Sequence, residues 1–328
     1  MRVLKEQDYK LLEQLVGLTE REVHAAMRQY LRSRYENMII TKEYIIAIGD
    51  IPIALVAHMD TVYKTPVSDL YYDQQKGVLW SPQGIGGDDR AGIFAILKIL
   101  QSGLRPSIIL TTGEEQGGVG ACAIVEAYPQ CPIPGLKYMI QLDRRGTNDC
   151  VFYDCYCPEF VDYVESFGFC ERWGSFTDIS FLMPQWDVVG VNLSVGYEDE
   201  HSLIETLHIN PLFDTIRKVK KMLVETEIPD FEYDEATIKN SAWWKNIAKN
   251  ANCRCCKCKK QLTEYELFPV IGKDKFVKSY CPDCIVGNVE WCEICGEAFE
   301  VHDSMDLKIC KMCMEDLCTK TLSDSLPK

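Results

Sequence analysis

The sequence lacks any long apolar run. No stretch of its 328 residues is apolar enough to span a bilayer, and no basic N-terminal segment precedes a short apolar stretch, as it would in a secretory signal. We therefore expect a cytoplasmic protein that does not bind membranes.

Positive charge is also scarce. The chain carries 35 Lys and Arg against 49 Asp and Glu, which gives a formal net charge of −14 at pH 7. Nonspecific binding of nucleic acid by the whole protein is therefore not expected, because the phosphate backbone is itself negative. Local basic stretches such as "CKCKK" and "KDKFVK" leave nucleic-acid contact as the less favoured alternative.

Cysteine is sparse in the first 250 residues and dense after them. Of 17 cysteines, 11 follow residue 250: ten lie in the stretches "CRCCKC", "CPDC", "CEIC" and "CKMC", and Cys318 stands apart. Disulfides are disfavoured in the cytoplasm, so paired C-x-x-C spacings favour metal ligands. The C-terminal stretch is therefore expected to be a small zinc-binding domain, over residues 253–328, whose folding energy comes largely from the metal.

Two structural zinc ions fit the spacing of these cysteines. The first set is Cys255, Cys258, Cys281 and Cys284, and the second is Cys292, Cys295, Cys310 and Cys313. Cys253 and Cys256 have the same spacing as the first pair and remain an alternative to it. The stretch resembles zinc-ribbon or treble-clef modules, with a LIM-like second half. We expect it to be structural or to bind a protein partner.

The first 235 residues alternate between two hydrophobic periodicities. Helical spacing of apolar residues predicts helices at 5–35, 92–100, 121–128, 158–169 and 210–227. Short apolar runs predict strands at 38–49, 51–60, 107–112, 137–143, 150–155 and 187–196. This alternation predicts an α/β domain over residues 1–235, with a mostly parallel or mixed sheet flanked by helices. Residues 236–252 are expected to be a linker.

Metal-ligating side chains follow five successive predicted strands or the loops after them. They are His58 and Asp60; Asp88 and Asp89; Glu114 and Glu115; Asp143; and His201. Ligands bind at the carboxyl ends of the strands in such sheets. Imidazole mixed with carboxylate suits two divalent cations, zinc or else cobalt or manganese, rather than calcium.

The motifs "AHMDTV", "GGDDRAG", "GEEQGGVG", "LDRRG" and the late "EH" resemble the co-catalytic zinc metallopeptidases, a group that includes peptidase T, carboxypeptidase G and single-domain leucine aminopeptidases. The resemblance covers about residues 45–225. It implies that His58, Asp88, Glu115, Asp143 and His201 are metal ligands, with Asp88 as the bridge. It also implies that Glu114 is the general acid/base and that Asp60 holds the ring of His58.

The chain departs from this family in length. Many members insert a lid or dimerisation domain before the last histidine, but only 57 residues separate Asp143 from His201 here. That favours the compact aminopeptidase-like branch, in which Asp178 of "GSFTDIS" is a substrate-pocket candidate. Arg144 is a second candidate, for binding a substrate carboxylate. His208 is an alternative to His201 as a ligand.

Three functions fit these motifs. The first is an aminopeptidase that acts on peptides or small amides. The second is a deacylase, dipeptidase or carboxypeptidase on the same scaffold. The third is a zinc-ribbon adaptor with an inactive hydrolase domain. No expected ligand is missing, which favours an enzyme. The sequence leaves the substrate, the native metal, the oligomeric state and the role of the C-terminal domain open.

Overall fold

The computed structural model describes residues 3–153, 155, 157–172, 174, 176–233, 255–260, 268–271, 277–285, 288–291, 298–301 and 308. The chain divides into two compact units. The first comprises residues 1–172 and 176–235, and the second consists mainly of residues 236–328. The predicted linker, 236–252, lies outside the described residues. Within the described ranges, no helix is both long and apolar enough to cross a membrane.

Two helices, rather than one, open the first unit. The helical stretch predicted over residues 5–35 is interrupted between α1 (Glu6–Val16) and α2 (Glu20–Arg32). Thr19 explains the break, because it starts α2 with a capping box. Its hydroxyl accepts from the N–H of Glu22, whose carboxylate accepts from the N–H of Thr19 at 2.9 Å.

An eight-stranded sheet forms the centre of the first unit. Its strand order is β1-β2-β6-β3-β7-β10-β8-β9. The strands are β1 (Met38–Ile40), β2 (Tyr44–Ala47), β3 (Ile51–His58), β6 (Pro106–Thr111), β7 (Tyr138–Arg144), β8 (Asp149–Val151), β9 (Cys170–Glu171) and β10 (Val189–Ser194). The central strands β6, β3, β7 and β10 are parallel, whereas β2 and β8 pair antiparallel with their inner neighbours. The predicted mixed, mostly parallel sheet is confirmed.

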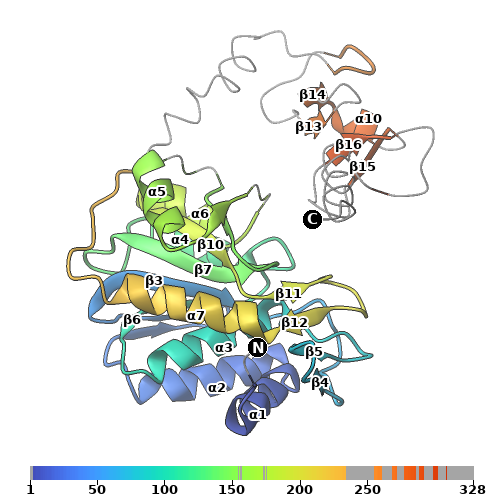
Figure 1. The fold of residues 1–328 in the computed structure, drawn as a ribbon. Helices are drawn as coiled ribbons and strands as arrows, with labels where there is room; N and C mark the ends of the chain where they lie inside the picture. The colour runs from blue at the N-terminus through green and yellow to red at the C-terminus, as the bar shows by residue number, and fades with distance from the viewer. Residues whose placement is uncertain are drawn as a thin grey trace, which may run out of the picture. The chain divides into compact units, whose positions relative to one another are not determined.

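Helices cover both faces of this sheet (Figure 1). Helices α3 (Gly87–Leu100) and α7 (Ile209–Leu223) pack on one face, with α1 against α3. Helices α4 (Val119–Ala127) and α6 (Ile179–Trp186) pack on the other, and α5 (Pro158–Ser166) lies on the same side. Strands covered on both faces have no polar face, which is why β3 and β6 are mostly apolar. The carboxyl ends of these strands therefore carry the site's polar side chains.

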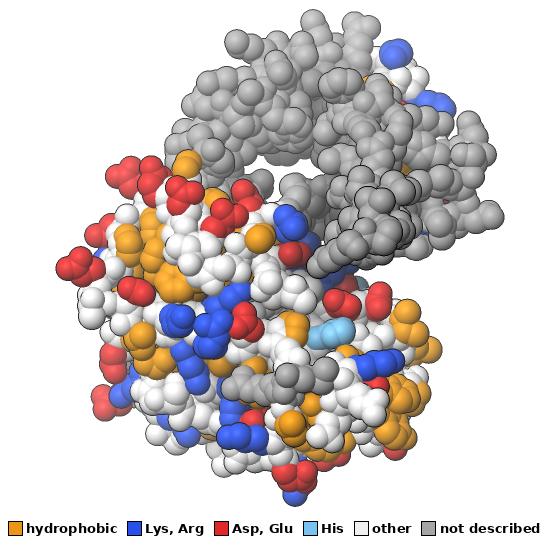
Figure 2. All heavy atoms as spheres, in the orientation of Figure 1, with side chains coloured by type: hydrophobic (Ala, Val, Ile, Leu, Met, Phe, Trp, Pro, Cys, Tyr) orange, Lys and Arg blue, Asp and Glu red, His pale blue; other side chains and the backbone are white. Residues whose placement is uncertain are grey.

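A smaller antiparallel sheet, which the sequence does not predict, adjoins the first unit's carboxyl-end loops. Its order is β11-β12-β5-β4, and its strands are β4 (Tyr71–Asp73), β5 (Val78–Trp80), β11 (Tyr197–Glu198) and β12 (Thr206–His208). Figure 2 shows apolar side chains gathered over these strands. Leu203 and Ile204, in the loop between β11 and β12, are 66% and 71% exposed.

The second unit contains a third sheet and a cysteine cluster. The sheet has the order β14-β13-β16-β15 and includes β13 (Phe268–Ile271), β14 (Val277–Tyr280), β15 (Val289–Trp291) and β16 (Ala298–Glu300), with the short helix α10 (Pro282–Ile285) after β14. Four sulfur atoms, those of Cys255, Cys258, Cys281 and Cys284, lie within 4.8 Å of one another. This is the first predicted zinc set. Cys253 and the second set, Cys292, Cys295, Cys310 and Cys313, lie outside the described residues.

Candidate metal centre

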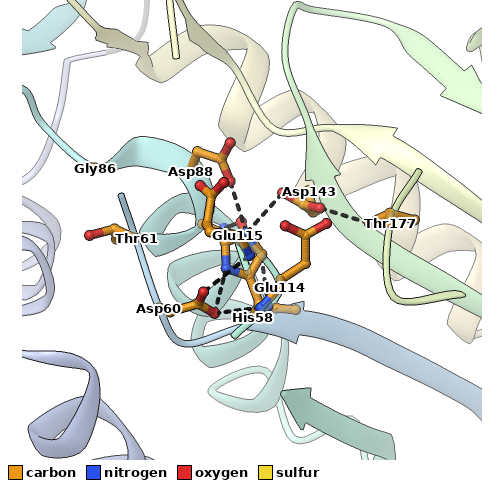
Figure 3. Close-up of polar contacts among 12 residues, drawn as sticks. His58, Asp60, Thr61, Gly86, Asp88, Glu114, Glu115, Asp143 and Thr177 are labelled. Atoms are coloured by element: carbon orange, nitrogen blue, oxygen red, sulfur yellow. Dashed lines mark hydrogen bonds and ion pairs between the residues drawn. The ribbon is translucent and has the colours of Figure 1, made fainter. Parts of the chain in front are cut away.

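The five side chains predicted as catalytic metal ligands converge at the carboxyl edge of the large sheet (Figure 3 shows four of them by label). They come from five elements. His58 ends β3, Asp88 lies at the start of α3, Glu115 follows β6, Asp143 lies near the end of β7, and His201 follows β11. His58 and His201, which are 143 positions apart in the sequence, therefore lie in the same cluster.

Asp88 lies between the two histidines. Its Oδ1 is 2.9 Å from Nε2 of His58, and its Oδ2 is 3.3 Å from Nε2 of His201. Each oxygen of one carboxylate thus faces a different imidazole. This is the geometry that a carboxylate bridging two cations requires.

Each histidine also contacts a second carboxylate. Oδ1 of Asp143 lies 3.4 Å from Nε2 of His58, and Oε1 of Glu115 lies 2.8 Å from Nε2 of His201. His58 is completely buried, whereas the side chain of His201 is 47% exposed. The arrangement is two half-sites that share Asp88, one deep and one open to solvent.

The groups in the cluster shift each other's protonation. Burial by itself would raise the pKa of Asp88, but hydrogen bonds with His201 and His58 bring it below its ordinary value. Contacts with Asp88 and Glu115 raise the pKa of His201 to about 11. Burial, together with the charge of Asp88, raises the pKa of Asp143 to about 7. The nearby carboxylates therefore favour the positively charged form of the two imidazoles.

This donor set fits two divalent cations. A cation must replace the protons on the imidazoles, and the carboxylates provide the negative charge that favours the exchange. Donors bound to a tetrahedral zinc at about 2.0–2.2 Å lie roughly 3.3–3.6 Å from one another. The His58–Asp143 and His201–Asp88 separations, 3.4 and 3.3 Å, already fall in that range.

Asp89, which follows Asp88, has a carboxylate oxygen within 4.8 Å of ligand atoms of His58 and Asp143, but its contacts differ from those of Asp88. Its Oδ2 accepts from the N–H of His58 at 3.3 Å, and its Oδ1 accepts from the N–H of Gly92 at 2.7 Å. Both oxygens therefore serve the backbone. Asp89 ties β3 to the first turn of α3 and so holds two ligand-bearing elements together.

Comparison with known proteins identifies solved structures of similar fold. The sequence matches no known family model and no curated protein. The aminopeptidase PepT from Bacillus cereus is 14% identical, with a TM-score of 0.52 over 67% of this chain and 98% of its own. A tripeptidase from Staphylococcus aureus is 14% identical, with a TM-score of 0.54 over 68% of this chain and 98% of its own. The first unit has the fold of these two peptidase structures. At this identity the similarity concerns the fold alone.

Asp60 lies behind His58. Its Oδ1 is 3.2 Å from Nδ1 of His58, as expected for a residue that orients the ring. The sequence did not predict its second contact. The same carboxylate accepts from the backbone N–H groups of Glu114 and Glu115, at 3.1 and 3.2 Å. Asp60 therefore also fixes the loop that carries both glutamates.

Glu114 directs its carboxyl group toward the same centre as Asp88 and Asp143 (Figure 3). Burial raises the pKa of this carboxyl to about 9, and the charges of Asp143 and Asp178 add to the increase. A carboxyl group with a raised pKa is suited to accept and return a proton. The charge of a bound cation would lower that pKa again.

Residues that the sequence did not predict hold Asp143 in place. Its Oδ2 accepts from the Thr177 hydroxyl at 2.9 Å and from the Gln141 amide at 3.1 Å. The hydroxyl of Tyr197 donates to the backbone carbonyl of Asp143 at 3.2 Å. Thr177, Gln141 and Tyr197 stand alone in the sequence, without a spacing that marks them. Only the fold brings them to this ligand.

The remaining candidates lie at the edge of the cluster or away from it. Asp178 is completely buried, and its Oδ2 accepts from the Thr111 hydroxyl at 2.5 Å, which places it beneath the site. Arg144 is half-buried directly after Asp143. Contact of either residue with a substrate stays a prediction. Nε2 of His208 lies 3.4 Å from Oε2 of Glu198, whereas His201 lies against Asp88 and Glu115.

Proposed function

We propose that this chain is a metal-dependent hydrolase of peptide bonds, and specifically an aminopeptidase. The observation that carries the proposal is the position of Asp88, one oxygen toward each of two histidines that have a further carboxylate each. A structural ion-pair network has no need of two such half-sites. An exopeptidase that works with two cations does.

The five side chains would hold two zinc ions, or cobalt or manganese in their place. His58 and Asp143 would hold one ion, His201 and Glu115 the other, and Asp88 both. When bound, the ions supply a Lewis acid that polarises the substrate carbonyl and makes a water molecule nucleophilic at neutral pH.

Glu114 would act as the general base and then as the general acid. Its carboxylate takes a proton from the attacking water and returns it to the leaving nitrogen, so the peptide bond breaks with no net change in the enzyme. Asp60 would keep His58 in one orientation while holding the backbone of Glu114. One buried side chain, that of Asp60, would therefore fix the position of Glu114 relative to His58.

The surface next to His201 supports a peptide substrate. Leu203 and Ile204 follow this histidine closely and are among the most exposed aliphatic side chains of the described residues. Exposed apolar side chains beside a polar centre suit the apolar side chains of a peptide better than a small polar amide. We expect a preference for peptides with an apolar N-terminal residue.

A panel of peptides with free and blocked N-termini tests the activity. An aminopeptidase cleaves the free peptides and spares the blocked ones, because it needs the amine. Cleavage of N-acylated substrates would instead identify a deacylase or carboxypeptidase on this scaffold. No hydrolysis by fully metallated protein, across dipeptides, longer peptides and acylated amino acids, would favour the adaptor alternative.

The second unit would bind zinc through Cys255, Cys258, Cys281 and Cys284. Their clustering within 4.8 Å is the observation that supports this ion. A second ion at Cys292, Cys295, Cys310 and Cys313 remains a proposal from sequence spacing. We propose that this unit serves stability or contact with a protein partner. Metal analysis should then give about four ions per chain for the enzyme, against about two for an adaptor with an inactive first unit.

A further inference from the structure

The glycine-rich turn before Asp88 is enclosed by two side chains from distant parts of the chain. A Cβ on Gly84 would lie 2.3 Å from ring atoms of Tyr63, and one on Gly87 would lie 3.2 Å from Oε1 of Glu205. A Cβ on Gly87 would also lie 3.0 Å from Cβ of Tyr197, so the turn has glycines where the surrounding side chains come closest. Side chains from other segments of the chain hold the turn in place, rather than side chains of the turn itself.

Glu205 makes the closest polar contacts with this turn. It is 1% exposed, and its two oxygens accept from two backbone N–H groups, Oε2 from Gly86 at 3.0 Å and Oε1 from Asp88 at 3.1 Å. The hydroxyl of Tyr63 lies 2.8 Å from Oε2 of Glu205 and 2.6 Å from the backbone carbonyl of Ser202, and it donates its proton between these two acceptors. These N–H groups stand at the start of α3, where a helix has no backbone acceptors of its own.

Glu205 and His201 belong to one five-residue segment. His201 faces the carboxylate of Asp88, while Glu205 binds the backbone N–H of the same residue. The segment therefore holds Asp88 at two points. A shift of the turn relative to the segment would change the distance from the Asp88 carboxylate to the imidazole of His201.

We propose that Glu205 is a positioning residue, which sets Asp88 at the correct distance from His201 for the second, more exposed cation. This inference rests on the proposed two-metal function. It assigns Glu205 no contact with substrate or metal. The effect passes through the backbone of Asp88, so it should be larger for the half-site of His201 and Glu115 than for that of His58 and Asp143.

The variant Glu205→Gln tests the inference without changing the size of the side chain. Both oxygens of Glu205 accept from N–H groups, and glutamine has only one oxygen. Its NH2 group would face a backbone donor, so one buried N–H loses its acceptor. Loss of a partner behind a metal ligand typically weakens metal affinity roughly 10–100-fold, and we expect that loss for the second equivalent.

Cobalt(II) titration of the full-length, chelator-treated protein is the measurement. Thiolate charge-transfer absorption marks cobalt at the cysteine cluster, whereas weaker d–d bands mark cobalt at the histidines and carboxylates. The control is Glu198→Gln, the same change at an exposed glutamate in the adjacent strand β11, which should titrate like the wild type. With peptide substrate, Glu205→Gln should recover much of its kcat at high cobalt concentration, because the chemical groups are intact.

The inference is overturned if Glu205→Gln binds the second cobalt as tightly as the wild type. Should that variant fail to fold, Tyr63→Phe decides, since it keeps the ring against Gly84 and removes only the hydroxyl. If Tyr63→Phe binds the second cobalt of the histidine–carboxylate centre several-fold more weakly than the wild type does, the inference is supported. If the variant binds it as tightly as the wild type, the inference is overturned. The proposed hydrolase fails separately, if the wild type binds both ions and cleaves none of the peptides.

Discussion

The carboxylate of Asp60 lies 3.2 Å from Nδ1 of His58, and the other ring nitrogen of that histidine faces Asp88 and Asp143. A carboxylate in this position fixes which nitrogen carries the proton and which one is available to a cation. The same side chain receives the N–H groups of both glutamates after β6. One buried aspartate therefore aligns the ends of two neighbouring strands.

Replacing Asp60 with asparagine should weaken metal binding. Asparagine keeps one oxygen and places an NH2 group against either the ring of His58 or a backbone N–H. We expect zinc affinity at the His58 half-site to fall roughly 10–100-fold, measured by competition with a chromophoric chelator. Asp69→Asn, at an exposed aspartate, is the matched control. Equal affinity in the two variants would remove Asp60 from the site.

Replacing Glu114 with glutamine should remove the proton carrier and leave the ligands in place. Loss of a general acid/base typically lowers kcat by about 10²–10⁴-fold, so peptide turnover should fall by that factor while the metal content stays constant. Glu126→Gln, on the exposed face of α4, should hydrolyse peptide at the wild-type rate. Full activity in Glu114→Gln would assign proton transfer to another group.

Removing the catalytic metals should lower the melting temperature of the first unit. Each ion bound at a free concentration 100 times its Kd adds about 2.7 kcal/mol. In a domain of this size 1 kcal/mol moves the Tm by about 2–4 °C, so we expect a decrease of roughly 5–10 °C by calorimetry for each ion removed. His201→Ala should lose part of this shift, and His208→Ala should keep it. An unchanged Tm after proven metal removal contradicts the metal centre.

Replacing Cys284 with serine should affect only the second unit. Three thiolates hold zinc less tightly than four, so zinc content should fall by about one ion per chain. Peptide hydrolysis should continue, because Cys284 contributes nothing to the site at His58. Cys122→Ser, at an exposed cysteine of α4, should keep full zinc content. Unchanged zinc in Cys284→Ser would mean that other cysteines form this site.

The sheet could be predicted from the sequence because its strands are buried on both faces. Continuous apolar runs such as residues 51–57 leave little else for the chain to form, and the polar residues that follow them mark the strand ends. The pattern marks the strand ends with His58 and Asp60, Asp88 and Asp89, Glu114 and Glu115, Asp143 and His201. The choice of five ligands among them rests on the resemblance to the co-catalytic zinc metallopeptidases. Their common position follows from parallel strands ending at one edge.

The supporting contacts could not be predicted in the same way. Glu205 lies in the apolar stretch "LIETLHIN", where a single acid gives no periodic signal. Thr177 and Tyr197 reach Asp143 only because α6 and β11 return to the sheet edge. The small sheet was also missed, since strands of two or three residues are too short to show alternation.

The spacing of His201 and Glu205 limits how this protein can change in length. An extended chain advances about 3.3–3.6 Å per residue, which exceeds the length of a metal–ligand bond. An insertion between these two residues would therefore pull either the imidazole or the carboxylate from Asp88. The loops between Asp143 and His201 have, among their described residues, no such double attachment to Asp88. A descendant of this protein could gain a lid in those loops and keep its metals, but not in the four-residue step from His201 to Glu205.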